Sequence, residues 1–197
     1  MGSYIPFGHY PINTKGESQP LVWLVLTVKN GKALLITDKL IDAVPYNTTY
    51  TDVTWETCTL RKWLNHDFLN AAFTNTHQSQ IATVTNPNAD NPKFRTMGGN
   101  PTQDKIFVFS IDEAKTYFQN NVSRMAAVTP YAMKQGSYYS DQYTLSNGEK
   151  PGWWWLRSLG MSGFGAVYVD RDGSILEYGG NITHSNGSVR PAFWLNL

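Results

Sequence analysis

WWWLRS (residues 153–158) and VRPAFWLNL (residues 189–197) are apolar, aromatic segments that frame a stretch of a different kind. Residues 159–188 consist of Gly, Ser, Asn, Asp and single aromatic residues, with small apolar residues between them. The framing segments predict framework strands, and the middle predicts short strands and turns whose outward positions are free to vary. A rigid scaffold that carries an irregular surface is more typical of binding than of chemistry.

The composition is that of one ordered domain. The chain has 197 residues, of which 41% are hydrophobic and 16% are charged, which is enough to bury a core without disulfides. The net charge of +1 comes without a Lys/Arg cluster, so we expect no nucleic-acid partner. No apolar run has membrane length, so we expect no membrane insertion, and we expect a monomer. The N-terminal residues lack an export-signal pattern, and the compartment stays open.

Strand-forming residues predict most of the framework. A hairpin is expected over residues 21–37, with its turn in Lys29-Asn30-Gly31-Lys32. A further strand is expected over residues 105–109. A second hairpin is expected over residues 166–178, ending where Gly179-Gly180 breaks the strand. One closing strand over residues 189–197 would bury Trp194 in the core.

Two helices complete the expected fold. Apolar residues recur at helical spacing within residues 52–73, and this pattern places Trp63 in the core. Residues 110–118 form the second helix, because Ser110 and Glu113 have the spacing of a capping box. The predicted fold class is therefore α+β, with two helices packed on a small, twisted antiparallel sheet and with long irregular loops.

Several segments resemble a known family. Residues 154–158, the pair Ala166-Val167 and residues 189–196 are similar to the variable proteins of diversity-generating retroelements. That resemblance implies a C-type lectin fold of the formylglycine-generating-enzyme type. The upstream part resembles a bacterial domain of unknown function often found with this fold. Its matching stretches are residues 7–11, 23–26, 33–36, 50–55, 60–65 and 104–107.

The resemblance also implies a mechanism of variation. In that family, miscopying of template adenines scatters substitutions over Asn codons and leaves the framework intact. Tyr, Ser, Asp, Phe, His and Thr, which occur between Leu159 and Ser188, lie few base changes from an Asn codon. Met161 and Glu177 do not fit this route. Either the template encodes these two residues, or the region is ordinary sequence that shares the fold.

Motifs for catalysis or metal binding are missing from the sequence. Cys58 is the single cysteine, whereas a formylglycine-generating enzyme needs a pair, so we interpret Cys58 as a small buried hydrophobe. The stretch Asp170-Arg171-Asp172-Gly173 is more typical of a hairpin turn than of a calcium loop, because the later ligands are absent. The histidines are dispersed: His9, His66, His77 and His184. We therefore expect no catalytic residues, no metal and no cofactor.

The run Trp153-Trp154-Trp155 has two interpretations. Alternate residues of a strand face opposite sides, so Trp154 can lie in the core while Trp153 and Trp155 face elsewhere. A wholly structural role is favoured over a stacking platform for a ligand.

The sequence thus predicts a non-enzymatic, ligand-binding display protein whose diversified C-terminal surface binds varied protein ligands. Two alternatives are an enzyme of the same fold with an unrecognised site and a structural module of a surface or phage assembly. The expected ligand-binding residues are Leu159, Met161, Ser162, Phe164, Tyr168, Asp170, Arg171, Asp172, Ser174, Leu176, Glu177, Tyr178, Asn181, Thr183, His184 and Asn186.

Strand alternation predicts how part of this set is arranged. Together with Phe164 and His184, five residues of the second hairpin should form one contiguous exposed face: Tyr168, Asp170, Ser174, Leu176 and Tyr178. Aromatic anchors among them would supply most of the binding energy.

Overall fold

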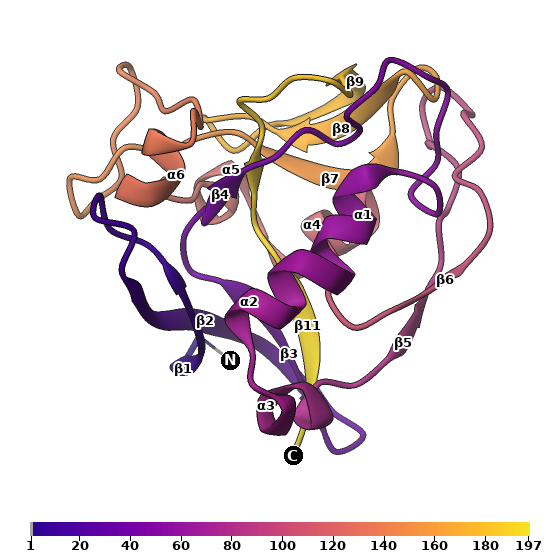
Figure 1. Ribbon diagram of the computed structural model, residues 1–197. Helices are drawn as coiled ribbons and strands as arrows, with labels where there is room; N and C mark the ends of the chain where they lie inside the picture. The colour runs from indigo at the N-terminus through magenta and orange to yellow at the C-terminus, as the bar shows by residue number, and fades with distance from the viewer. Residues whose placement is uncertain (1) are drawn as a thin grey trace.

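β-strands make up most of the computed structural model, which describes residues 2–197 (Figure 1). These residues form 11 strands in three sheets, and helical segments lie between them in the chain. The expected α+β C-type lectin fold with two helices on one small sheet is therefore wrong. The physical reason is that the apolar segments at both ends of the chain pair with each other as strands, so that sheets and not helices supply most of the framework.

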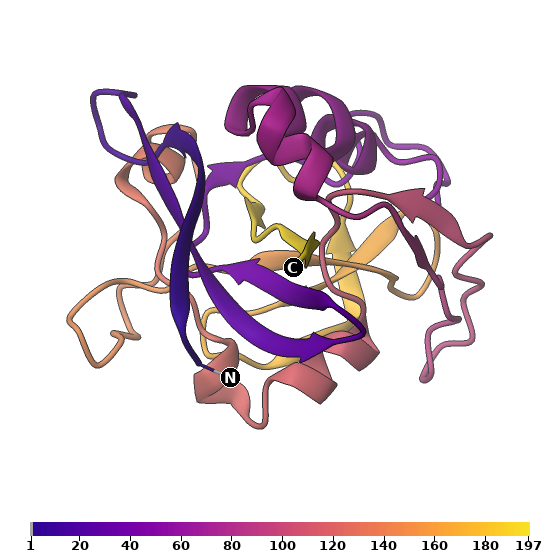
Figure 2. The same ribbon diagram turned by 90° about the horizontal axis from the view of Figure 1, so that it is seen from below.

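The first sheet joins the two ends of the described chain. Its strands are β1 (Tyr4–Pro11), β2 (Ser18–Lys29), β3 (Lys32–Thr37) and β11 (Ala192–Asn196), in that order and all antiparallel. The predicted hairpin is confirmed, and its turn uses Asn30 and Gly31 at φ values of 52° and 70°, as a tight two-residue turn requires. Figure 2 shows the twisted β1–β2 ribbon on one side of the molecule and the C-terminus near the centre of the view.

The second sheet contains most of the tryptophan-rich segment 153–158, whereas most of the segment 189–197 lies in β11 of the first sheet. The order of the second sheet is β4 (Asp42–Ala43), β10 (Ser188–Val189), β7 (Trp154–Leu159), β8 (Gly165–Val169) and β9 (Ile175–Asn181). The predicted hairpin of β8 and β9 is confirmed, and the amide of Asp170 donates to the carbonyl of Ser174 at 2.8 Å. The break expected at Gly179-Gly180 is wrong, because Gly180 pairs with Ala166 and β9 continues to Asn181.

The predicted closing strand is also divided. β10 pairs with β4 and β7, whereas β11 pairs with β3 in the other sheet. Arg190 and Pro191 separate the two strands, and a proline cannot donate a hydrogen bond within a sheet. The carbonyl of Pro191 instead accepts from the amide of Thr37 at 3.0 Å. One short segment therefore connects both sheets.

A third sheet and the helices occupy the rest. β5 (Val84–Asn86) pairs with β6 (Thr102–Asp104). The helices are α1 (Thr59–Trp63), the π-helical η1 (Leu64–Phe68), α2 (Leu69–Ala72), α3 (Asn75–Gln80), α4 (Ile111–Tyr117), α5 (Asn121–Arg124) and α6 (Pro130–Lys134). α1, η1 and α2 follow one another without a gap (Figure 1).

Two predicted boundaries are wrong. The first helix begins at Thr59 and not at residue 52, because the carbonyl of Thr54 already accepts from the amides of Thr57 and Cys58 in a turn. Residues 105–109 form only an isolated bridge between Phe107 and Ala192 in place of a strand. α4 is confirmed, and its Ser110 and Glu113 form the predicted capping box.

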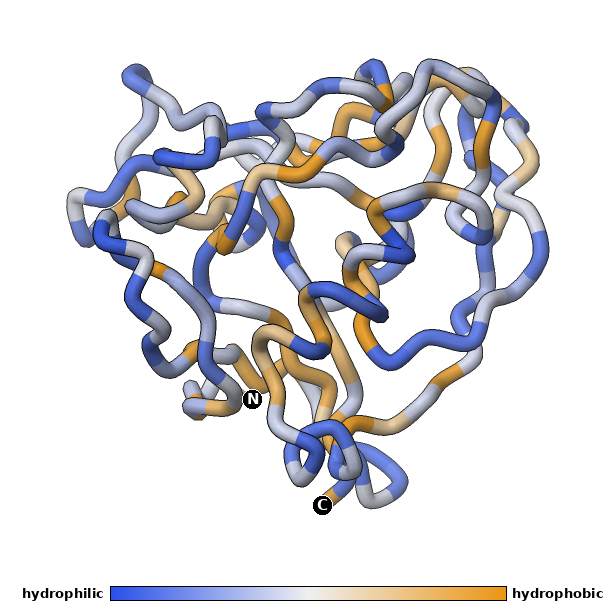
Figure 3. Tube along the Cα trace, in the orientation of Figure 1, coloured by the Kyte–Doolittle hydropathy of each residue, from blue (hydrophilic) through white to orange (hydrophobic). Residues whose placement is uncertain are grey.

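One continuous core extends from the first sheet and the continuous helix to the second sheet. Figure 3 shows apolar stretches concentrated in the interior around β3 and β11, whereas the outer loops are mostly polar. Phe193 of β11 is fully buried, and its ring lies 4.6 Å from that of Trp23 and 5.4 Å from that of Phe7. Trp63 and Trp194 are only half-buried against this core, so the expectation that both lie inside it is wrong.

Phe193 and Trp194, which are neighbours in β11, make a matched test. Phe193→Ala should lower the free energy of unfolding by about 3–5 kcal/mol, because it leaves a cavity among the aromatic rings. Trp194→Ala should cost clearly less, because its ring is only partly buried and lies under the Lys29 ammonium at 5.1 Å. Urea denaturation of both variants measures the difference, and equal losses would contradict this account of the core.

Candidate ligand-binding surface

An open hollow of about 300 Å³ lies over the second sheet, within the region where the sequence predicts a binding surface. We call it the aromatic hollow. Three aromatic rings and one imidazole contribute to its lining, and the remaining groups are charged, polar or glycine. Its lining residues are Tyr138, Trp153, Tyr168, Asp170, Arg171, Gly180, His184 and Asn186.

The floor of the hollow follows from strand alternation in β7. Trp154 packs on the opposite side of the sheet, and Trp153 and Trp155 share the hollow's side, with their ring centroids 4.7 Å apart. The Trp155 indole N–H donates to the carbonyl of Val44 at 3.1 Å. A Cβ on Gly187 would lie 2.2 Å from Trp155 Nε1, so glycine is the residue that fits against these rings.

Tyr168 stands at the centre of this side of the sheet. Val167 and Val169 are fully buried on the other side, as predicted, while the Tyr168 ring lies 5.1 Å from that of Trp153. Burial raises the pKa of the Tyr168 phenol, and the hydrogen bond with Tyr178 and the charge of Asp170 raise it further. The phenol is therefore neutral near pH 7 and can both donate and accept a hydrogen bond.

The rim combines two parts of the chain that lie far apart in sequence. Arg171 Nη1 donates to the Tyr138 hydroxyl at 2.7 Å, and the guanidinium carbon lies 5.3 Å from the centre of that ring. The amide of Tyr138 donates to the carbonyl of Asn186 at 3.2 Å. An Asp170 carboxylate oxygen lies 4.0 Å from Arg171 Nε. The rim thus offers one cation and one anion beside aromatic rings.

The predicted binding residues separate into groups. The hollow brings together five of them: Tyr168, Asp170, Arg171, His184 and Asn186. Tyr178 is 49% exposed beside the hollow, with its hydroxyl 3.3 Å from that of Tyr168. Phe164 is 36% exposed and packs against Tyr50, with the ring centroids 5.0 Å apart. The predicted contiguous face is therefore partly exposed, and its half-buried members are Tyr168, Asp170, Ser174 and Leu176.

Other predicted residues lie elsewhere. Leu159 is 3% exposed at the end of β7, so its assignment to the surface is wrong; it packs inward with the core. Glu177 pairs with Lys115 at 2.7 Å, and strand alternation places it on the side of β9 opposite to Tyr178. Asp172 accepts from the amide of Ser174 within the hairpin turn. The exposed or half-buried remainder are Met161, Ser162, Asn181 and Thr183.

Sequence reasoning missed three residues of the hollow, Tyr138, Trp153 and Gly180, and one residue beside Phe164. Tyr138 belongs to the pair Tyr138-Tyr139 in an otherwise polar loop, and that pair was the available signal. Trp153 is 9% exposed and lines the hollow, although a structural role was favoured for the tryptophan run. Tyr50 gave no periodic signal, because its pairing with Phe164 depends on the fold.

Cys58, the single cysteine, is well shielded. Burial raises the pKa of the Cys58 thiol to about 12, and Cys58 is fully buried, which confirms its interpretation as a small hydrophobe. Within residues 2–197, no three side chains of His, Cys, Asp or Glu gather where they could hold a metal ion. Over the same residues, no helix is both long and apolar enough to cross a membrane.

The contact with Gly187 gives a test of the floor. Gly187→Ala should lower the free energy of unfolding by about 1–3 kcal/mol, because the new methyl group overlaps the Trp155 indole. Gly165→Ala is the control, since its nearest neighbour would be the Gly180 carbonyl oxygen at an ordinary 3.5 Å. Thermal melts and near-ultraviolet circular dichroism compare the two. A stable Gly187→Ala protein with an unchanged tryptophan spectrum would contradict this packing.

A family model described as "Domain of unknown function (DUF6273)" matches residues 30–197. No curated protein and no solved structure matches the chain.

Proposed function

The chain belongs to the DUF6273 family, a domain of unknown function, and we propose that it is a binding protein whose aromatic hollow receives part of a protein ligand. One observation carries the proposal: aromatic rings from separate segments meet at a hollow that the chain's own side chains leave open. Exposed aromatic groups beside a charged rim are typical of binding surfaces. Tyrosine and tryptophan also provide large contact areas at low entropic cost.

The exposed groups around the hollow favour a protein over a small molecule. Tyr178 adjoins the hollow, and Phe164, just before β8, adds a second exposed aromatic contact with Tyr50. Met161, three positions from Phe164, is 64% exposed. A surface with several separate anchors suits an extended partner, because protein interfaces combine aromatic contacts in the centre with a polar rim.

Diversification of this surface is part of the proposal. Side chains outside residues 159–188 hydrogen-bond to the backbone of this stretch. Substitutions within the stretch would leave these bonds in place, which supports the proposal that its side chains vary. Asn91 Nδ2 donates to the carbonyls of Leu159 and Glu177 at 2.7 and 2.9 Å, and Thr96 Oγ1 donates to the carbonyl of Gly160 at 2.7 Å. A near-repeat of the segment encoding residues 154–195 beside a reverse-transcriptase gene would support this part, and genome sequence without one would count against it.

A triple variant tests the binding surface. Changing Phe164, Tyr178 and His184 to Ser should weaken binding by at least about 30-fold, because truncating one anchor residue typically costs about 2 kcal/mol or more. The fold should persist, since exposed substitutions typically change stability by about 0.5 kcal/mol or less each. The partner is first recovered from a lysate with the unmodified chain and identified, and its Kd is then measured by calorimetry.

The matched control changes three exposed apolar residues of the first sheet and its edge to Ser: Val22, Val28 and Leu197. This variant should bind the same partner as tightly as the unmodified chain does. Undiminished binding by the first variant, or equal loss in both, would end the proposal that the aromatic hollow is the contact site.

A further inference from the structure

Arg190 is a buried cation at the point where the chain passes from β10 to β11. It is 3% exposed, and its guanidinium carbon lies between two rings, 5.0 Å from the centre of Phe118 and 5.2 Å from that of Trp154. Stacking on aromatic faces suits the delocalised charge of arginine. The rings hold the guanidinium in one orientation without supplying a counter-charge.

The hydrogen bonds of Arg190 go to backbone carbonyls. Nε donates to Thr37 at 3.1 Å and Nη1 to Arg124 at 3.1 Å, while Nη2 reaches the Asp38 carbonyl only at 3.5 Å. A guanidinium carries more N–H donors than these contacts use. Nη2 therefore has the greatest capacity for a further acceptor.

No carboxylate of residues 2–197 lies within 4.0 Å of this guanidinium. Burial lowers the pKa of Arg190 to about 10, and the charge of Asp38 offsets this only in part. The guanidinium is thus still a cation at pH 7. A buried charge without a direct partner is costly, so an anion that reached it would be stabilised.

A pocket of about 500 Å³ gives access to Arg190. Its volume lies within the range of small-molecule sites. Apolar walls come from Leu24, Met125 and Leu145, and Ser146 contributes a hydroxyl. We call it the Arg190 pocket. It lies apart from the aromatic hollow, since the two share no lining residue.

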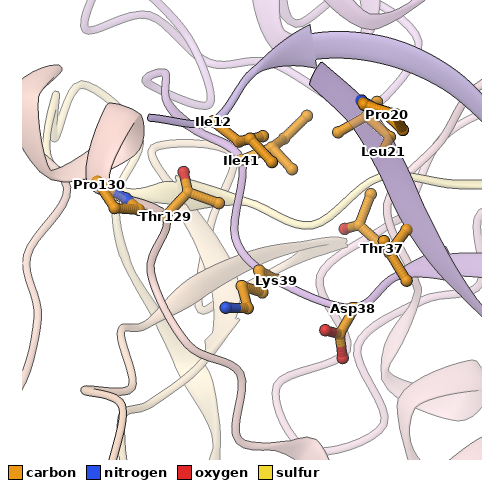
Figure 4. Close-up of a pocket in the computed structure, with 10 residues that line it drawn as sticks. Ile12, Pro20, Leu21, Thr37, Asp38, Lys39, Ile41, Thr129 and Pro130 are labelled. Atoms are coloured by element: carbon orange, nitrogen blue, oxygen red, sulfur yellow. The ribbon is translucent and has the colours of Figure 1, made fainter. Parts of the chain in front are cut away.

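The other charged residues of the pocket restrict which ligands it can bind. Lys39 is paired with Glu149, and Asp38 also lines the wall. Figure 4 shows Asp38 and Lys39 in the neighbouring apolar pocket of about 210 Å³, on the side opposite to Ile12. Asp38, whose charge acts on the guanidinium, and Glu149, which also lines the pocket, disfavour a dianion such as phosphate. They disfavour a planar monoanion far less, and a carboxylate matches the fork of N–H donors.

We propose that the Arg190 pocket binds the carboxylate group of a small organic acid, with Nη2 of Arg190 as donor and the apolar wall around the organic part. The preceding proposal does not depend on this site. Binding here requires the buried guanidinium, whereas the protein ligand contacts the aromatic hollow.

Side-chain NMR of the ¹⁵N-labelled full chain tests this directly. Benzoate, added as the probe, should shift the Nε–Hε signal of Arg190 in a saturable way. Benzamide, which has the same ring but no charge, and inorganic phosphate should leave it in place. The signal of Arg157 is the internal control, because Arg157 is also buried and donates to a backbone carbonyl but does not line the pocket.

Two tryptophan substitutions in one loop separate pocket binding from surface binding. Ser146→Trp places a large ring at the pocket wall and should weaken benzoate binding by at least about tenfold, a change of about 1.4 kcal/mol. Gln142→Trp lies in the same exposed loop without lining the pocket and should leave the Kd unchanged. The proposal fails if benzoate produces no saturable shift, if benzamide or phosphate shifts Arg190 as strongly, or if both variants bind equally.

Discussion

The antiparallel pairing of β3 with β11 is the interaction on which the other parts of the structure depend. It completes the first sheet and positions Phe193 against Trp23. The same chain segment begins in the second sheet as β10, where Ser188 pairs with Trp154. The passage through Arg190 and Pro191 therefore ties the two sheets together. If the pairing register of β11 shifted by one residue, the side chain of Phe193 would face solvent.

The two proposed sites stand on either side of the second sheet. Trp153 and Trp155 support the aromatic hollow, while Trp154 on the opposite side stacks on the Arg190 guanidinium. Successive tryptophans of one strand thus serve different surfaces, as the two-residue period of a strand requires. The tryptophan run consequently combines a structural role with a place in the wall of the hollow, and the sequence alone offered these as alternatives.

Local sequence patterns correctly predicted the features that depend on neighbouring residues, namely two hairpin turns and the start of α4. Asn30 and Gly31 specified one hairpin turn, and Asp170 to Gly173 specified another. Ser110 and Glu113 marked the start of α4. The pairing of distant strands has no such signature, so the sheet order and the division of the closing segment could not be derived. The overall class was consequently misjudged as α+β.

Only part of the candidate surface was predictable, namely the part that follows from alternation within one strand. Alternation in β8 placed Tyr168 outward and the valines inward, and both placements hold. Leu159 was misplaced because its burial depends on contacts beyond its own strand. Tyr138 was missed because its loop meets the sheet through Arg171 and Asn186, which lie in distant parts of the chain. When the residues that line a hollow come from separate loops, no single segment of the sequence carries a pattern that predicts them.

The junction of the two sheets also bears on how the chain folds as it leaves the ribosome. Arg190 bonds to Thr37 across 153 positions of sequence, and β11 joins β3 over a similar span. During synthesis this edge of β3 stays open until β11 emerges. Contacts of such long range slow folding, and unpaired edges invite association between chains. Nascent chains that stall before β11 would therefore be the species most in need of a chaperone.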